Sequence, residues 1–447
     1  MSEAAVSHYL AEYDRFRDTL AASWPVQRRS DALDYLKTHG FPTRRTEQWK
    51  YTDVSPIIRR KFTLGKLPAA PIDDALVEKL RFSRLNCHEL VFINGSFSSE
   101  LSRTPDLPSG ATVRALQSDG DGNAELLERY FGNEDIGHAF TALNTAFLND
   151  GVLVHVPDGM EIPAPIHIIH LGGQEDETQP SQPSPMSHPR NLIALGRQAG
   201  ASIIETYAGF PDSEYFTNTH TSILAQAGAR LDYYKIQQES QRAYHIGKTR
   251  IRQEADSRVD CHALSLGGKL ARWDIDVELV EPGAEINLNG LYLTGNRQHV
   301  DNHTLVEHKQ PHTTSNEHYR GIMNGRSRAV FNGKVIVHEQ AQKTEAHQSN
   351  ANLLLSADAE VDTKPELEIY ADDVKCSHGA TVGRLDENML FYLRSRAVDE
   401  DTARSLLTYA FADEVIRDIR FPEIRERLEQ SIAGELPDTD LIKEFMQ

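Results

Sequence analysis

The stretch Pro282-Gly283-Ala284-Glu285-Ile286-Asn287-Leu288-Asn289 decides the fold, because it joins a tight turn to a run of alternating polar and apolar residues. Pro and Gly favour turns, and an alternation with a period of two is typical of a strand with one buried face. The same arrangement begins at residues 199, 227 and 255, so the four units are spaced by 28, 28 and 27 residues. We interpret the middle of the chain as a series of repeats.

Each repeat also holds a second extended segment; these segments are Thr219 to Ala225, Tyr244 to Ile251, Arg272 to Val280 and Val300 to Glu307. One such unit cannot bury its inner face alone, so a fixed period in this range predicts a solenoid of stacked turns. The strands then run parallel, as rungs of a β-helix. Ala357-Asp358-Ala359, 75 residues after the fourth unit, is expected to mark a turn about three periods later. An antiparallel sandwich with evenly spaced turns is the alternative.

Helical patterns flank the repeats, and we expect a mostly helical region at 1–150, the β-helix at 151–385 and a second helical region at 386–447. The expected elements of the first region are helices at Ala4–Leu20, Asp31–Thr38 and His138–Leu148 and a strand at Leu90–Asn94. The polar, proline-rich run from Gly172 to Pro189 predicts a loop between rungs.

One helix is predicted after Asp399 or Asp401, either of which is a suitable N-cap. Its apolar residues cover more than half of the helix circumference; they are Leu406, Leu407, Ala410, Phe411, Val415, Ile416 and Ile419. A single packing face needs only a stripe. The helix is therefore either deep in a small bundle or held between its own domain and a partner.

The composition narrows the class of protein. The formal charge of −19 opposes nucleic-acid binding, which needs a basic face. We find no run of eighteen apolar residues and no signal-peptide pattern after Met1, so we expect no membrane span and a cytoplasmic location. Three widely separated cysteines fit a reducing compartment rather than a disulfide framework.

Motifs of several enzyme classes are incomplete. Gly247-Lys248-Thr249 resembles the end of a phosphate-binding loop, but Arg242 stands where that loop needs glycine. His338-Glu339 is followed by Gln342 where a zinc-protease helix needs its second histidine. The missing glycine predicts that the chain is not itself an ATPase. A β-helix enzyme that acts on polysaccharides is the alternative, although such enzymes are typically secreted.

Histidines are concentrated late in the chain; those before the last block are His299, His303, His308, His312, His318, His338 and His347. Polar ladders on a solenoid explain most of them without a metal. Cys376 and His378 differ, because residues i and i+2 of a strand share one face and could ligate one metal ion. Lys375, His378 and Arg384, which are cationic or can become so, are expected to lower the pKa of the thiol and favour the thiolate. A buried structural cysteine beside a surface histidine is the alternative.

Several segments have a family likeness; they are Glu47-Gln48-Trp49-Lys50-Tyr51-Thr52, Asp301-Asn302-His303, Pro311-His312-Thr313-Thr314-Ser315, Phe331-Asn332-Gly333-Lys334-Val335, Cys376-Ser377-His378-Gly379-Ala380-Thr381 and Leu390 to Arg396. They resemble SufD, a branch of the SufB/SufD family in the SUF machinery that assembles iron–sulfur clusters. SufB, the sibling scaffold, is the alternative. It carries Glu-His-Glu-Ala where this chain has Ser377-His378-Gly379-Ala380, and a cluster-building cysteine where His347 to Leu355 has none.

The resemblance implies a right-handed parallel β-helix flanked by N-terminal and C-terminal helical regions. It implies a non-catalytic subunit of a SufB–SufC–SufD scaffold, whose β-helix pairs with SufB and which forms a homodimer when SufB is absent. The C-terminal helices would dock the SufC ATPase, with Leu407, Phe411, Val415 and Ile419 as candidate contacts.

The resemblance also makes His378 the best candidate ligand for iron or a nascent cluster at the SufB seam, with Cys376 as an accompanying candidate. No firmly bound cofactor is implied; iron or a cluster would be transient, and a reduced flavin could visit the complex. Ala397 departs from the family, which usually has glycine there, so the flank of a helix is expected to be slightly repositioned.

Overall fold

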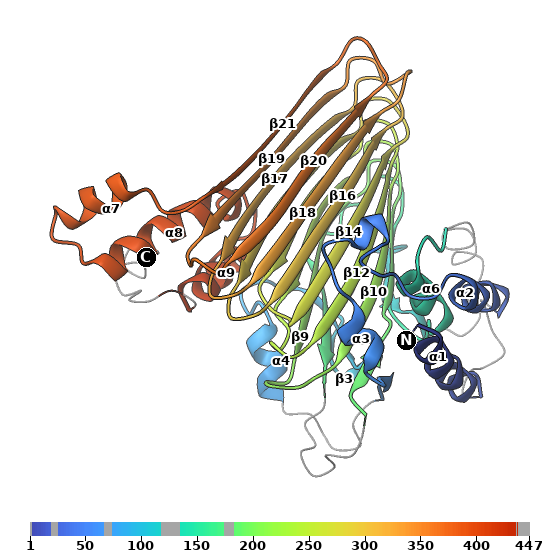
Figure 1. Cartoon of the computed structure of the whole chain (residues 1–447). Coiled ribbons are helices and arrows are strands. Elements are labelled where there is room, and N and C mark those ends of the chain that lie inside the picture. Colours follow the sequence, from blue (N-terminus) through green and yellow to red (C-terminus); the bar gives the residue numbers. More distant parts are fainter. Residues whose placement is uncertain are drawn as a thin grey trace.

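The computed structural model describes residues 2–18, 26–66, 74–117, 135–173, 183–434 and 436. Its centre is a parallel β-solenoid of about seven turns, in which two sheets face each other. Helices α1, α2 and α6 of the N-terminal region lie at one side of the solenoid, whereas α4 lies on the side of the C-terminal helices (Figure 1). The prediction of a mainly β protein with a parallel β-helix between two helical regions is confirmed.

One sheet, called sheet A, contains β4 (Thr112–Ala115), β5 (Val152–Val156), β8 (Arg190–Leu195), β10 (Phe216–Ala225), β12 (Tyr244–Gln253), β14 (Leu270–Leu279), β16 (His299–His308), β18 (Arg328–Val337) and β20 (Glu360–Ile369), with β1 (Thr63–Leu64) and β7 (Pro185–Ser187) at its side. The other, sheet B, contains β2 (His88–Ile93), β3 (Ser96–Arg103), β6 (Ile166–Gly172), β9 (Gly200–Gly209), β11 (Arg230–Gln237), β13 (Arg258–Ser265), β15 (Glu285–Thr294), β17 (Thr314–Met323), β19 (Glu345–Leu354) and β21 (Lys375–Gly383). From β8 onward the chain alternates between the sheets, so each turn adds one strand to each.

The strands within a sheet are parallel and in register from turn to turn. Ile286 of β15, for example, stacks between Val259 of β13 and Ser315 of β17. Alternate side chains point between the sheets, where Ile286 and Leu288 are fully buried. The antiparallel sandwich is therefore wrong for the repeats; among the described strands only β2–β3 and β4–β5 pair antiparallel.

The first four turn motifs lie before β9, β11, β13 and β15, all in sheet B, as predicted. Ala357-Asp358-Ala359 instead precedes β20 of sheet A, so the prediction of its phase is wrong by half a turn. The corners before β9, β11, β13, β15, β17 and β19 share one residue with positive φ rather than a small-residue triplet. Gly228 and Gly283 supply it early, but His312 and Lys343 supply it before β17 and β19.

The N-terminal region contains α1 (Ser2–Arg17), α2 (Val26–His39), the 3₁₀ turn η1 (Glu47–Trp49), α3 (Ser55–Arg59), α4 (Asp74–Leu80) and α6 (Ala139–Ala146). The predicted first helix corresponds to α1, while its last predicted residue, Leu20, lies outside the described residues. Tyr9, Phe41, Trp49 and Phe140 form an aromatic core with these helices. Of the predicted loop from Gly172 to Pro189, 174–182 lie outside the described residues and 185–187 form β7.

The C-terminal region contains α7 (Glu387–Arg394), α8 (Glu400–Ile416) and α9 (Pro422–Gly434). Asp399 caps α8, since its carboxylate accepts a hydrogen bond from the Thr402 amide at 2.9 Å. Helix α8 lies on the outer face of sheet B, against β15 and β17. Helix α9 reaches the N-terminal region, where Arg427 donates to the carbonyl oxygens of Leu80 and Arg81.

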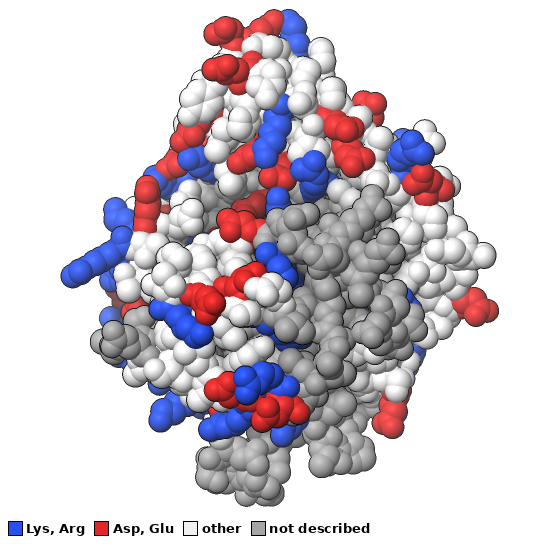
Figure 2. All heavy atoms as spheres, turned by 90° about the vertical axis from the view of Figure 1, so that its right-hand side faces the viewer, with Lys and Arg blue, Asp and Glu red and all other residues white. Residues whose placement is uncertain are grey.

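The surface that carries the N-terminal helices mixes the two signs of charge. Figure 2 shows Lys and Arg side chains interspersed with Asp and Glu side chains on this face. Lys248 pairs with Asp276 at 2.7 Å, and Lys309 pairs with Glu278 at 2.9 Å. Such a surface lacks the basic stripe of a nucleic-acid binder among its described residues. In the described ranges, no helix has both the length and the apolar character needed to cross a bilayer.

Candidate functional site

The last rung of sheet B carries both predicted metal ligands. Cys376 and His378 lie on β21, which pairs only with β19 among the described strands and so forms the open edge of the sheet (Figure 1). Their register partners are Ala346 and Gln348, whose side chains are buried in the solenoid interior. Cys376 and His378 therefore share the face that looks toward sheet A, as the i, i+2 spacing predicts.

The two side chains differ in exposure. Cys376 is half-buried and packs against the main core, whereas His378 is exposed and makes no hydrogen bond to another described residue. Burial raises the pKa of the Cys376 thiol, so the expectation that its neighbours favour the thiolate is wrong for this chain. The reason is geometric: Lys375 points to the opposite face and pairs with Glu345 at 2.7 Å.

Several of the other late histidines have structural partners. His308 is fully buried, and its ring nitrogens lie 2.8 Å from Thr313 Oγ1 and 2.9 Å from Ser315 Oγ. Burial lowers its pKa to about 3, so this imidazole is neutral. His347 Nδ1 lies 2.8 Å from Ser377 Oγ. Within the described residues, no group of three or more His, Cys, Asp or Glu side chains is arranged to hold a metal ion.

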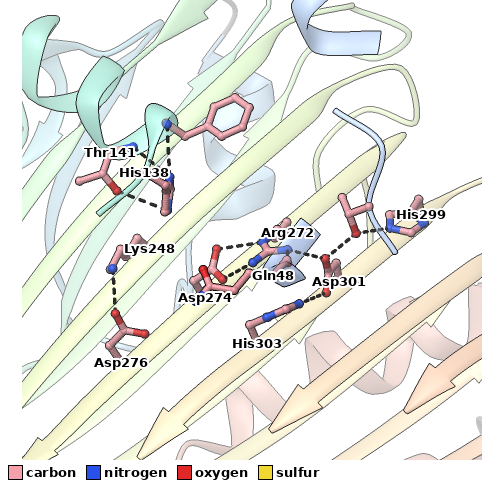
Figure 3. Close-up of polar contacts among 12 residues, drawn as sticks. Gln48, His138, Thr141, Lys248, Arg272, Asp274, Asp276, His299, Asp301 and His303 are labelled. Carbon is pink, nitrogen blue, oxygen red and sulfur yellow. Dashed lines mark hydrogen bonds and ion pairs between the residues drawn. The ribbon is translucent and has the colours of Figure 1, made fainter. Parts of the chain in front are cut away.

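A polar cluster on the outer face of sheet A was not predicted (Figure 3). Arg272 of β14 is fully buried and binds Asp274 at 2.7 Å, Asp301 at 2.9 Å and the Gln48 carbonyl oxygen at 2.6 Å. Although burial opposes ionisation of Asp274, the Arg272 guanidinium lowers its pKa to about 2. The cluster therefore holds paired charges.

This cluster fastens the segment from Glu47 to Thr52 to the solenoid. The Thr52 hydroxyl donates to Asp301 at 2.5 Å and lies 2.8 Å from His299 Nε2. Trp49 is buried between Arg272 and α6, whose N-cap is His138. The family-like segment singled out in the sequence is thus a structural attachment. Its only sequence signal was the aromatic residue among polar ones.

Part of the apolar surface predicted for α8 packs against the protein's own sheet B. Val415 and Ile419 are buried in a cluster that includes Ile204 and Ile322 of sheet B. Leu407 and Phe411 are half-buried, and the Arg320 guanidinium covers the Phe411 ring at 4.8 Å from its centroid. Val415 and Ile419 are consequently out of reach of a partner while α8 stays in place.

Among the described residues of the C-terminal region, the exposed large apolar side chains lie on α7 instead. Met389, Phe391 and Tyr392 are 56%, 75% and 55% exposed, and only Leu390 of this helix is buried. Helix α7 packs on α8 and projects away from the solenoid (Figure 1). The sequence reasoning singled out the neighbouring helix because its apolar residues are more numerous.

Two family models and several known proteins match this chain. Residues 178–411 match the family model described as "SUF system FeS cluster assembly, SufBD core domain", and residues 3–168 match "SufBD protein N-terminal region". An iron–sulfur cluster assembly SufBD family protein of Synechocystis is 35% identical over 419 residues, which cover 91% of this chain and 90% of that protein. The iron–sulfur cluster assembly protein SufD of Escherichia coli is 31% identical, with 91% and 92% covered. Protein ABCI7 of Arabidopsis chloroplasts is 31% identical, with 94% and 89% covered.

Proposed function

The chain belongs to the SufBD family of the SUF system for iron–sulfur cluster assembly, and we propose that it is the SufD-type, non-catalytic subunit of a SufB–SufC–SufD scaffold. Its solenoid pairs with that of a SufB subunit, its C-terminal region docks the SufC ATPase, and iron passes through the seam as cargo. A cytoplasmic location stays a prediction.

The open end of the solenoid supports pairing with a second β-helix. Strands β20 and β21 each pair on one side only among the described strands, so their outer edges offer unpaired backbone groups. Exposed strand edges pair readily with strands of another chain. Ile369, Tyr370 and Val382 are exposed at this end and would be covered by the partner. The same edge permits the predicted homodimer when SufB is absent.

The position of His378 carries the proposal for iron. An exposed imidazole, which has no hydrogen-bond partner in the described part of the chain, lies on the edge strand beside a half-buried thiol on the same face. Imidazole and thiolate are both good ligands for iron. Because burial raises the pKa of Cys376, we assign His378 the first contact and Cys376 a contact that follows once the cation favours its thiolate.

The C-terminal helices support the docking of an ATPase. Helix α8 is held on sheet B by its buried residue Val415, and the segment that follows it by the buried Ile419, so we assign these two a supporting role. Leu407 and Phe411 retain partial exposure, and α7 adds the exposed Phe391. Aromatic side chains that stand free on a surface are typical centres of protein interfaces.

Anaerobic coexpression with SufB and SufC tests the proposal. His378→Ala should leave the complex intact while its iron and sulfide content falls. His347→Ala is the matched control, because His347 is also exposed and lies one rung away on the outer face. Unchanged iron and sulfide in His378→Ala would assign the chemistry to SufB alone, and failure of the complex to form would overturn the SufD-type assignment.

A further inference from the structure

A polar column runs inward from His378 along the interior of sheet B. His378 of β21 is in register with Gln348 of β19, and Gln348 is in register with Glu317 of β17. Gln348 and Glu317 are 3% and 2% exposed. The next residue in the column, Leu288 of β15, is apolar. Three polar rungs therefore begin at the open end and stop where the ordinary core begins.

Glu317 is a buried carboxyl group that has no cationic partner within the described ranges. Thr304 of β16 donates to one carboxylate oxygen at 2.5 Å, and the Gln348 amide donates to the other at 3.3 Å. No ion pair to Glu317 is found among the described residues; on its own face of β17 the nearest titratable group is Tyr319, while the adjacent His318 lies on the outer face beside Arg320 and Glu414. Burial raises the pKa of Glu317 to about 7, so its charge can change near neutral pH.

Gln348 spans the interior between the two sheets. Its amide nitrogen is committed to Glu317 on the inner rung, while its amide oxygen is buried and has no hydrogen-bond partner in the described chain. Gly333 of β18, on the opposite sheet, leaves the space for this amide, since a Cβ atom there would collide with it. A buried, unpartnered acceptor is costly. The strand that neighbours Gln348 on the side of the open end is β21, which carries His378.

We propose that Glu317 and Gln348 are positioning residues for the iron site at the seam. In this arrangement Gln348 accepts a hydrogen bond from the His378 ring and orients it, and Glu317 supplies the negative charge that balances an incoming cation. This inference rests on the proposed function and deepens it.

Glu317 is close enough to His378 for its charge to change the affinity of the site for iron. Two strand spacings separate the rungs of Glu317 and His378, about 9.5 Å. At that distance, with an effective dielectric constant of about 50, between the values for a protein surface and for water, one negative charge changes the affinity for Fe²⁺ by about tenfold. A purely structural carboxyl group would be served as well by glutamine, so the isosteric substitution separates the two roles.

The test uses the SufB–SufC–SufD complex, prepared anaerobically and titrated with Fe²⁺ at pH 6 and pH 8. Glu317→Gln keeps the size of the side chain and removes its charge. The ratio of wild-type to Glu317→Gln affinity should rise from near one at pH 6 to about ten at pH 8. Gln348→Met, which removes the bridge and keeps the length, should weaken binding at both pH values.

Glu345→Gln is the matched control, because Glu345 is one rung from Cys376 but points to the outer face, where it pairs with Lys375. It should leave the affinity and its pH profile unchanged. His378→Ala is titrated in parallel. If His378→Ala abolishes iron binding while Glu317→Gln and Gln348→Met match wild type at both pH values, the positioning role is wrong and the proposed function stands. If His378→Ala binds iron like wild type, the iron role of His378 is wrong, and the column's role falls with it.

Discussion

The Arg272 guanidinium lies over the Trp49 ring, with its central carbon 3.8 Å from the ring centroid. This contact joins a residue of the N-terminal region to one 223 positions later in the chain. Arg272 also binds two buried carboxylates, so one side chain combines a stacking contact with two ion pairs.

Arg272→Met should detach the segment from Glu47 to Thr52, because it removes the guanidinium that binds Asp274 and the fully buried Asp301 and leaves Asp301 with His303 alone as a basic partner among the described residues. Breaking a buried pair by removing one partner costs about 3 to 5 kcal/mol. Urea unfolding and limited proteolysis near Trp49 measure the effect. Arg252→Met is the control, since Arg252 lies on the same sheet, is 51% exposed and has only a 3.5 Å contact with Glu278. An equal loss of unfolding free energy in both variants would contradict the role of Arg272 in attaching this segment.

Ala397→Gly should stabilise the end of α7. Ala397 has φ +66°, and the next amide, that of Val398, bonds back to the Leu393 carbonyl at 3.3 Å. This left-handed position favours glycine, so the substitution should add about 1 kcal/mol. Thermal unfolding and hydrogen exchange in α7 report it. The same change at Ala410, an exposed position within α8, should destabilise by about 1 kcal/mol; a loss at both positions would refute the local explanation.

Phe391→Ser should weaken binding of the ATPase without affecting folding. The ring is 75% exposed, so the unfolding free energy should change by less than about 0.5 kcal/mol. Loss of a central aromatic contact weakens an interface by about 2 kcal/mol or more, which calorimetry with SufC would detect. Tyr370→Ser, 59% exposed at the solenoid end, should leave SufC binding intact. Undiminished SufC affinity in Phe391→Ser would exclude α7 from the interface.

Glu317→Gln should become more stable relative to wild type as the pH rises. The pKa of Glu317 is raised from 4.5 to about 7, so between these values the folded state holds a proton that the unfolded state has lost. The protonated Glu317 side chain makes its full contribution to the free energy of unfolding below pH 4.5. This contribution declines as the pH rises toward 7, by about 1.4 kcal/mol per pH unit. Urea unfolding at pH 4.5 and pH 7.5 should show a relative gain on the order of 3 kcal/mol. A constant difference between the two proteins would contradict the raised pKa.

The repeat was predictable from the sequence because strand alternation and turn residues recur with a fixed spacing. Its phase was not, since His312 and Lys343 adopt the left-handed corner conformation that Gly228 and Gly283 adopt elsewhere. The corner needs one residue of positive φ, and a composition-based pattern recognises only the residues for which that is common.

The pair Cys376 and His378 was predictable because the spacing along one strand fixes the shared face. The column behind it was not, since Gln348 and Glu317 lie 30 and 61 residues earlier and meet only through the register of the turns. The thiol pKa was also mispredicted. Sequence proximity suggested that Lys375 acts on Cys376, but adjacent residues of a strand point to opposite faces.

Strand β21 ends at Gly383 and α7 begins at Glu387, so only Arg384, Leu385 and Asp386 lie between the edge strand and the exposed helix. Fully extended, this three-residue linker spans about 14 Å. Leu385 packs against the apolar cluster that contains residues of α8 and α9, so the linker has even less freedom to extend. A partner that pulls on α7 therefore pulls on the strand of Cys376 and His378 almost at once, and the chain gives the two surfaces a mechanical connection without a hinge domain.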